Sequence, residues 1–250
     1  MARRPYVLAS AAMSADGYID DASPRRLILS SPEDLDRVDA ERAGCDAIMV
    51  GAQTVRSDNP RLLIRSEARR ARRAARGLPS SPAKVTITAS GDLDRDARLF
   101  AADGAAKLVY AAAGATGELS LRLEGRAEVI AMPDRHGLAW VLADLAGRGI
   151  GRLMIEGGSR LLAQVLSEGL ADEFQLAVAP VLVADPAAPR LLTPWPPAAR
   201  SSGGRADPSG RASGLTSSGT VPPARMVLAG STSAGDMAVL RYVPRARSPS

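Results

Sequence analysis

The sequence predicts an α/β sandwich in which helices cover a largely parallel sheet. Strand-like and helix-like segments alternate along most of the chain, as they do in β-α-β units. Residues 46–51 (DAIMVG) are apolar almost throughout, which is typical of a strand buried on both faces. Residues 153–155 form an apolar run that is followed by Glu156 and two glycines, which indicates a tight turn between a strand and a helix.

The first part of the chain contains two strands and a clearly marked helix. Residues 6–13 are mostly apolar and predict a buried strand, ended by the turn residues at 14–17. A helix over 31–43 follows from a serine N-cap, a proline at the first helical position and two acidic residues after it. Gly44 ends that helix, and the strand at 46–51 follows. Thr54 and Asp58 lie four residues apart, so one helical turn would place both on the same side.

The rest of the chain continues the alternation as a single domain. Residues 195–224 are rich in Pro, Ser, Gly, Ala and Arg, and such a segment buries too little surface to offset the entropy lost on ordering. We therefore predict a flexible insertion at about 196–225, a domain core over about 5–195 and 226–244, and a disordered tail beyond it. The predicted elements are strands at 85–88, 107–111, 127–131, 153–155 and 173–181, helices at 138–146 and 159–168, and a last pair of strands at 226–229 and 237–243.

The composition excludes several kinds of chemistry. Cys45 is the only cysteine and His136 the only histidine, so the chain cannot form an internal disulfide or the common Cys/His zinc sites, and we expect no metal. A nucleophile–histidine pair would depend on His136. Hydride transfer from a cofactor needs neither a metal nor a nucleophile. No segment approaches the roughly 20 apolar residues that span a bilayer, and no signal peptide is apparent, so we expect a cytoplasmic protein without membrane contact.

The charge balance favours an anionic partner. The formal net charge is +5 with 46% hydrophobic residues, which suits nucleic acid, acidic membranes or phosphorylated small molecules. The densest basic run, residues 69–76 (RRARRAAR), is expected to be a solvated loop or a short exposed helix. It has no interleaved aromatic residues to stack on bases, which disfavours a nucleic-acid partner.

Glu156 and the glycine pair Gly157–Gly158 form the strongest local candidate for a ligand site. The turn between a strand and a helix leaves backbone N–H groups unpaired, and the helix dipole there favours an anion. The same turn also occurs as a purely structural connection, and it is neither a dinucleotide fingerprint nor a P-loop. Glu156 lies at the strand end where open α/β sheets bind ligands, so it is either a helix-start residue or a ligand contact.

Arg42 is a second candidate because of its position on a helix. It lies on the same stripe as Leu35 and Val38, which face the core, and a buried arginine requires an anionic or hydrogen-bonding partner. That partner is either an internal carboxylate, such as Asp39 or Asp46, or a substrate phosphate or carbonyl. Together with the cation Arg65, these residues predict a polar, arginine-rich pocket for a phosphorylated ligand.

Several segments together resemble the pyrimidine reductase family of riboflavin biosynthesis, the C-terminal reductase domain of RibD. The resemblance covers most of residues 5–195 and, more weakly, 226–243. It implies a three-layer α/β/α dihydrofolate-reductase-like fold with a mostly parallel mixed sheet, a homodimer, and NADPH as cofactor. The segments are 13–17 (MSADG), 46–51 (DAIMVG) with 54–55 (TV), 58–62 (DNPRL), 156–158 (EGG), 170–173 (LADE) and 179–180 (AP).

The resemblance also implies site residues and a reaction. The reaction reduces the ribosylamino side chain of a 5-aminopyrimidine 5′-phosphate to ribitylamino, with hydride delivered to the sugar C1′. Asp16 and Glu156 are candidates for proton transfer. The residues expected to bind NADPH are Ala12, Thr54, Asp58, Gly157, Gly158, Ser159, Arg160 and Leu161. Those expected to bind the substrate are Arg42, Leu62, Arg65 and Glu156.

Two departures from the family pattern keep other functions open. Many bacterial relatives carry a lysine at the position of Ser10, and a lysine or arginine is common at the position of Tyr18. The alternatives are a reductase of the same fold acting on another pyrimidine, pterin or specialised-metabolite precursor, a catalytically idle dimer partner, and a non-catalytic basic protein that binds nucleic acid. The zinc deaminase of bifunctional relatives needs histidine and cysteine ligands that this chain does not contain, so we expect no deamination from it.

Overall fold

The computed structural model of the protein describes residues 4–23, 26–133, 137–192 and 225–245. His136, most of the predicted insertion and the end of the tail lie outside these ranges. The elements in chain order are β1 (Tyr6–Ser14), α1 (Pro32–Ala43), β2 (Ala47–Gly51), α2 (Ala52–Asp58), α3 (Glu67–Ala74), β3 (Ala83–Thr88), the 3₁₀ helix η1 (Arg98–Phe100), β4 (Lys107–Ala112), α4 (Ala113–Arg122), β5 (Glu128–Met132), α5 (Leu138–Gly147), β6 (Arg152–Glu156), α6 (Ser159–Ser167), β7 (Glu173–Ala179), β8 (Met226–Ala234) and β9 (Met237–Pro244).

The strands form one mixed sheet of nine strands in the order β5-β4-β3-β2-β6-β1-β7-β9-β8. All neighbours from β5 to β7 pair in parallel, and β9 pairs antiparallel with both β7 and β8. The register places Ser10 of β1 opposite Glu156 of β6 and Gln175 of β7. The predicted mostly parallel mixed sheet is confirmed.

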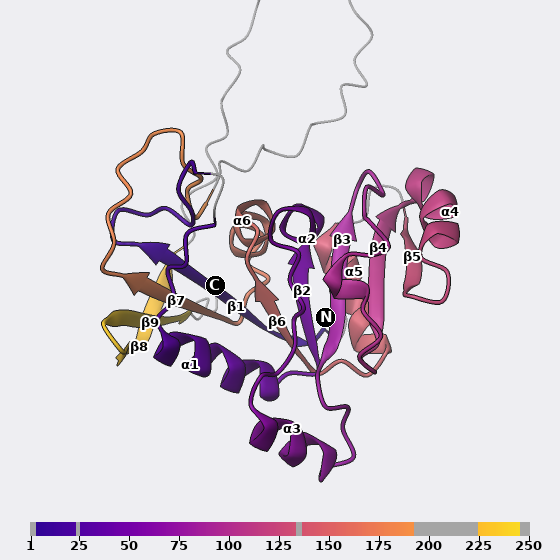
Figure 1. Ribbon diagram of the computed structural model, residues 1–250, viewed down its shortest axis with the longest axis horizontal. Helices are drawn as coiled ribbons and strands as arrows, with labels where there is room; N and C mark the ends of the chain where they lie inside the picture. The colour runs from indigo at the N-terminus through magenta and orange to yellow at the C-terminus, as the bar shows by residue number, and fades with distance from the viewer. Residues whose placement is uncertain (1–3, 24–25, 134–136, 193–224, 246–250) are drawn as a thin grey trace, which may run out of the picture.

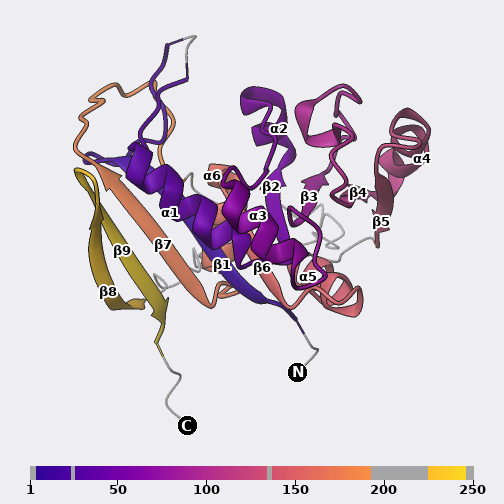
Figure 2. The same ribbon diagram turned by 60° about the horizontal axis from the view of Figure 1, so that its bottom comes forward.

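Helices cover both faces of this sheet, because successive strand residues point to opposite sides. Met49 belongs to the core cluster that α5 and α6 cover, whereas its neighbours Ile48 and Val50 belong to the cluster beneath α2 and α4. On the same side as α2, Val38 of α1 packs on Leu8 and other strand residues. Figure 2 shows α1 lying across this face with α3 beside it. The three-layer α/β/α architecture is confirmed.

The carboxyl ends of the central strands form the edge at which the candidate site lies. β2 ends at Gly51, where α2 begins, and β6 ends at Glu156, shortly before α6. β2 and β6 are direct neighbours in the sheet, so α2 and α6 start side by side (Figure 1). This is the edge at which open parallel sheets bind ligands.

The helix α1 begins as the sequence predicts, and its first turn also anchors the last hairpin. The Ser31 hydroxyl accepts a hydrogen bond from the Asp34 N–H, which is the expected N-cap. The same hydroxyl donates to the carbonyl of Ala234, the last residue of β8, at 3.0 Å. α1 therefore joins the C-terminal hairpin to the rest of the fold.

Three features differ from what the sequence indicated. The helix α4 was not predicted, because it has no side-chain N-cap and contains the helix-weakening residues Gly114 and Gly117. β8 runs five residues further than predicted, to Ala234. The basic run is largely the helix α3, which is short and mostly exposed as expected, but Arg73 within it is only 4% exposed.

Two arginines of α3 bind acceptors elsewhere in the protein. Arg73 donates hydrogen bonds to the backbone carbonyls of Ala43 and Cys45 at 3.0 and 2.8 Å, and Arg69 pairs with two carboxylates of α1. Buried guanidinium groups need such acceptors. Within the described ranges, no helix has the length and apolar character needed to cross a membrane.

Candidate functional site

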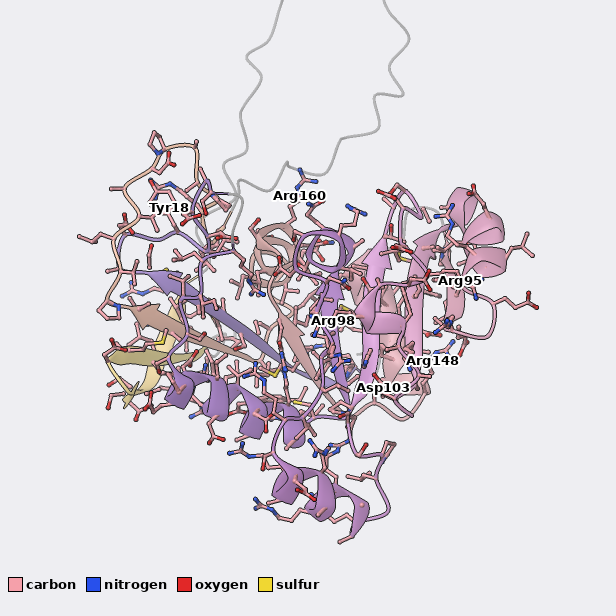
Figure 3. All side chains as sticks on the ribbon, viewed as in Figure 1. Tyr18, Arg95, Arg98, Asp103, Arg148 and Arg160 are labelled. Atoms are coloured by element: carbon pink, nitrogen blue, oxygen red, sulfur yellow. The ribbon has the colours of Figure 1, made fainter. Side chains whose placement is uncertain are left out.

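The turn between β6 and α6 exposes backbone donors toward the carboxyl edge of the sheet. Gly157 and Gly158 both have positive φ angles, +66° and +80°, which only glycine adopts without strain. The N-terminus of α6 has no side-chain cap and no acidic residue in its first turn. Arg160 in this first turn is exposed and lies at the same end of the molecule (Figure 3). Uncapped N–H groups, the helix dipole and a nearby cation together suit a phosphate.

The start of α2 forms the opposite wall of this turn. A methyl group placed at Gly158 would lie 3.1 Å from the Thr54 hydroxyl oxygen and 3.8 Å from the backbone nitrogen of Gly51. It would also lie 3.9 Å from the Cβ atom of Leu161. The structure thus brings together Thr54, Gly157, Gly158 and Leu161, four of the residues predicted to bind the cofactor.

Two other predicted cofactor residues lie further from the turn along their elements. Asp58 is the last residue of α2; its carboxylate accepts a hydrogen bond from Ser57 at 2.7 Å and lies 3.5 Å from the Arg26 guanidinium. Ala12 is near the end of β1, opposite Ala177 of β7. Both therefore belong to the same carboxyl edge of the sheet.

Arg42 and Glu156 form a bidentate ion pair next to the turn. The Nε and Nη2 groups of Arg42 donate to the two carboxylate oxygens of Glu156 at 2.6 and 2.5 Å. The side chains are 13% and 16% exposed. Burial alone would lower the pKa of Arg42, but the adjacent carboxylate outweighs it and raises the pKa above its usual value. Of the alternatives left open by the sequence, an internal salt bridge is present, but its partner is Glu156 and not Asp39 or Asp46.

Arg42 also contacts the loop between α2 and α3. Its Nη1 group donates to the carbonyl of Leu63 at 3.1 Å. Leu62 has a φ of +50° and is 3% exposed, so its side chain lies in the core and only its backbone is free to contact a ligand. Arg65 is exposed, and its guanidinium has no ion pair or hydrogen bond among the described residues. The loop thus carries an unpaired cation two residues after the Leu63 carbonyl that Arg42 contacts.

Asp16 has a structural environment that disfavours proton donation. Its carboxylate accepts hydrogen bonds from the Ser14 hydroxyl at 2.6 Å and from the backbone N–H groups of Val183 and Ala184 at 3.1 and 2.8 Å. These hydrogen bonds, that of Ser14 above all, lower the pKa of Asp16. An ionised Asp16 holds the loop after β7 against the turn after β1.

The positions of the two family departures are filled in different ways. Ser10 is 5% exposed and lies next to Glu156 in the sheet register, so no cation from β1 reaches that carboxylate. Tyr18 is covered by Arg190, whose guanidinium carbon lies 4.4 Å from the ring centroid and whose Nη2 donates to the Tyr18 hydroxyl at 2.9 Å. Figure 3 shows Tyr18 at the edge of the molecule beside β1. The contact between Arg190 and Tyr18 could not be predicted from the sequence, because the two residues are far apart along the chain.

Sequence reasoning also missed a polar hollow at the ends of β3 and β4. Its volume is about 480 Å³, and its walls include Ser90, Gly91, Asp92, Gly114 and Arg122. Arg56 of α2 donates to the Asp92 carbonyl at 2.8 Å, which places the hollow beside α2. The detectable signal was the small and polar residues that directly follow each buried strand. In the described part of the chain, no group of three or more His, Cys, Asp or Glu side chains is placed to hold a metal ion.

Comparisons with known proteins agree on one family. The sequence profile of the RibD C-terminal domain matches residues 5–200. The chain is 36% identical over 181 residues to the 2,5-diamino-6-ribosylamino-4(3H)-pyrimidinone 5′-phosphate reductase of Archaeoglobus fulgidus, which covers 72% of this chain and 82% of that protein. It is 38% identical over 181 residues to the protein of the same name from Methanothermobacter thermautotrophicus, which covers 72% and 80%.

A solved structure supports the same fold. It is the diaminohydroxyphosphoribosylaminopyrimidine deaminase/5-amino-6-(5-phosphoribosylamino)uracil reductase of Thermotoga maritima, with a TM-score of 0.72 at 20% identity. The match covers 97% of this chain and 57% of that chain.

Proposed function

The chain belongs to the RibD C-terminal domain family, and from this membership we propose that it is an NADPH-dependent reductase of a ribosylaminopyrimidine 5′-phosphate. The proposed reaction reduces the ribosylamino side chain to ribitylamino. One observation carries the proposal: the uncapped Gly157–Gly158 turn lies between Thr54 and the Arg42–Glu156 pair. A phosphate-binding backbone and a charged recognition pair therefore share one edge of the sheet.

The cofactor would be held mainly by backbone groups. A cofactor phosphate fits the turn because any side chain at Gly158 would fill the space in front of Thr54. Ser159, Arg160 and Leu161 form the first turn of α6, with Arg160 supplying positive charge. NADPH supplies the hydride when bound. The hollow beside α2 suits the far end of such a dinucleotide.

The substrate would lie on the other side of the turn. Arg65 has an unpaired guanidinium for the 5′-phosphate, whereas Arg42 and Glu156 present a preformed pair of opposite charges to the polar groups of the substrate. Positioning of this kind can lower a barrier by roughly 7–11 kcal/mol. Asp16 is disfavoured as the acid because its pKa is lowered. We propose that the proton comes from solvent and that Glu156 orients the group of the sugar that accepts it.

The test is NADPH oxidation at 340 nm with the diamino form of the substrate and with its deaminated form. The names of the relatives at 36% and 38% identity favour the diamino form. Turnover with NADPH that exceeds turnover with NADH would support the cofactor assignment. NADPH binding without turnover of either form would direct the search to another pyrimidine or pterin and would contradict the proposed reaction.

We also propose that the protein is a homodimer. The edge strand β8 is mostly exposed, and Val227 and Leu228 are 45% and 53% exposed. An apolar edge strand of this kind favours pairing with another strand, which a symmetric second copy would provide. Sedimentation of the wild type at dimer mass, and of Leu228→Lys at monomer mass, would support this proposal. A wild-type monomer at micromolar concentration would refute it.

A further inference from the structure

Asp39 of α1 is almost fully buried, yet its hydrogen bonds serve a different segment. Asp39 is only 2% exposed. One carboxylate oxygen accepts a short hydrogen bond from the backbone N–H of Arg65, and the other accepts from the backbone N–H of Ser66 at 3.1 Å. The second oxygen also accepts from the Arg69 guanidinium at 3.0 Å. The acceptor capacity of Asp39 is therefore directed at the loop and at the start of α3.

Other side chains hold the neighbouring peptide groups of this loop. The Ser81 hydroxyl accepts from the Ile64 N–H at 3.2 Å, and Arg42 donates to the Leu63 carbonyl at 3.1 Å. Arg70 donates to the carbonyls of Ile64 and Arg65 at 2.9 and 2.7 Å. The peptide groups on both sides of Arg65 are thus fixed, while its own guanidinium has no partner among the described residues.

We infer that Asp39 is a positioning residue that fixes the backbone at Arg65 so that its guanidinium is presented to the substrate phosphate. The inference rests on the proposed function. A loop held in its binding geometry loses less conformational entropy when the ligand binds, so the preorganisation appears as affinity. Arg42 and Asp39 lie three residues apart on α1, and one helix thereby places both Glu156 and the loop.

The charge of Asp39 matters for this role. Burial would raise the pKa of its carboxyl, but the Arg65 and Ser66 N–H donors and Arg69 outweigh burial and lower the pKa. The group is therefore an ionised acceptor at neutral pH, and charge-assisted hydrogen bonds to backbone N–H groups are stronger than neutral ones. In Asp39→Asn the side-chain NH2 group would face at least one of the N–H donors of Arg65, Ser66 and Arg69, and that hydrogen bond would be lost.

The experiment compares Asp39→Asn with Asp36→Asn. Asp36 lies on the same helix and pairs with the same Arg69, at 2.5 Å, but its carboxylate has no hydrogen bond to the described residues of the loop and is 68% exposed at its side chain. We expect Asp39→Asn to raise the KM for the phosphorylated pyrimidine about tenfold, with the NADPH affinity unchanged within twofold. Asp36→Asn should leave both quantities unchanged within twofold. In an Arg65→Ala background, Asp39→Asn should raise the KM no further.

A second readout does not depend on turnover. Trypsin should cleave after Arg61 or Arg65 at least tenfold faster in Asp39→Asn than in the wild type or in Asp36→Asn, because the loop is released. If Asp39→Asn does not fold, Asp39→Glu keeps the charge but displaces both oxygens, and it should show the same pattern more weakly.

The outcomes separate the inference from the proposed function. A wild-type chain without turnover of either pyrimidine would refute the proposed function, and the protease result would then decide whether Asp39 holds the loop. Turnover by the wild type with an unchanged KM in a folded Asp39→Asn variant would overturn the inference alone. Equal losses of substrate and NADPH affinity, or an undiminished effect in the Arg65→Ala background, would also overturn it.

Discussion

Replacing Arg42 and Glu156 singly and together tests whether their ion pair stabilises the fold as one unit. The pair is bidentate, with donor–acceptor distances of 2.6 and 2.5 Å, and its side chains are 13% and 16% exposed. Removing one partner of a fully buried pair costs about 3–5 kcal/mol, because the other charge remains without compensation. The residual exposure lets water solvate the remaining charge, so we expect Arg42→Met or Glu156→Leu to lower the free energy of unfolding by about 2–4 kcal/mol.

The double variant should cost little more than either single variant. Replacing both charges with apolar side chains removes the uncompensated charge, so the coupling energy should be close to the cost of one single variant, about 2–4 kcal/mol. The assay is urea unfolding monitored by circular dichroism, with m-values compared to confirm two-state behaviour. For a chain of this size, a loss of 1 kcal/mol lowers the Tm by about 2–4 °C, so each single variant should melt clearly earlier.

The exposed pair Arg4–Asp172 provides a matched control. It is also bidentate, at 2.5 and 2.8 Å, but its side chains are 34% and 27% exposed. Exposed pairs contribute about 0–1 kcal/mol, so its coupling energy should be well below that of Arg42 and Glu156. The same double-mutant comparison would be made for both pairs. Equal coupling energies for the two pairs, or a coupling energy below about 0.5 kcal/mol for Arg42 and Glu156, would refute the argument that burial makes this pair strong.

Three further predictions concern single positions. Gly158→Ala should weaken NADPH binding at least tenfold, measured by fluorescence titration, because its methyl group would meet Thr54 at 3.1 Å with a φ of +80°; unchanged affinity would exclude this turn as the phosphate site. Gly235→Ala should cost about 1–2 kcal/mol of stability from its left-handed backbone alone, since φ is +62°. The new methyl group would in addition lie 2.5 Å from the Glu33 carboxylate. An unchanged Tm would show that the hairpin turn relaxes freely. Cys45 is buried, and burial raises its pKa to about 11, so at pH 8 it should react with a thiol reagent only after unfolding; rapid labelling of the native protein would contradict this burial.

Local signals explain which elements the sequence predicted well. The start of α1 was specified by Ser31, Pro32 and the acids that follow, and the structure places the N-cap hydrogen bond at that serine. α4 was missed because no comparable signal precedes Ala113 and two glycines interrupt it. Capping chemistry acts over a few residues and is therefore visible in a sequence, whereas α4 depends on Leu119 being buried in the core.

Long-range partners explain what the sequence left open in the site. The helical stripe showed that Arg42 needed an anionic partner, but nothing local distinguished Asp39 and Asp46 from the distant Glu156. Periodicity reports which face of a helix is buried, and only the fold decides which strand end meets that face. Arg190 over Tyr18 was invisible for the same reason.

The position of β1 has a consequence for the synthesis of the chain. β1 precedes the other strands of this sheet along the chain, yet both of its neighbours, β6 and β7, follow about 150 residues later, as the pairing of Ser10 with Glu156 shows. At the usual translation rate of about 5–20 residues per second, about 8–30 seconds pass before the partner strands of β1 are synthesised. Parallel pairing over such a sequence distance is also intrinsically slow. Because exposed, unpaired strands are prone to aggregate, we expect a chain truncated before β6 to yield an insoluble product.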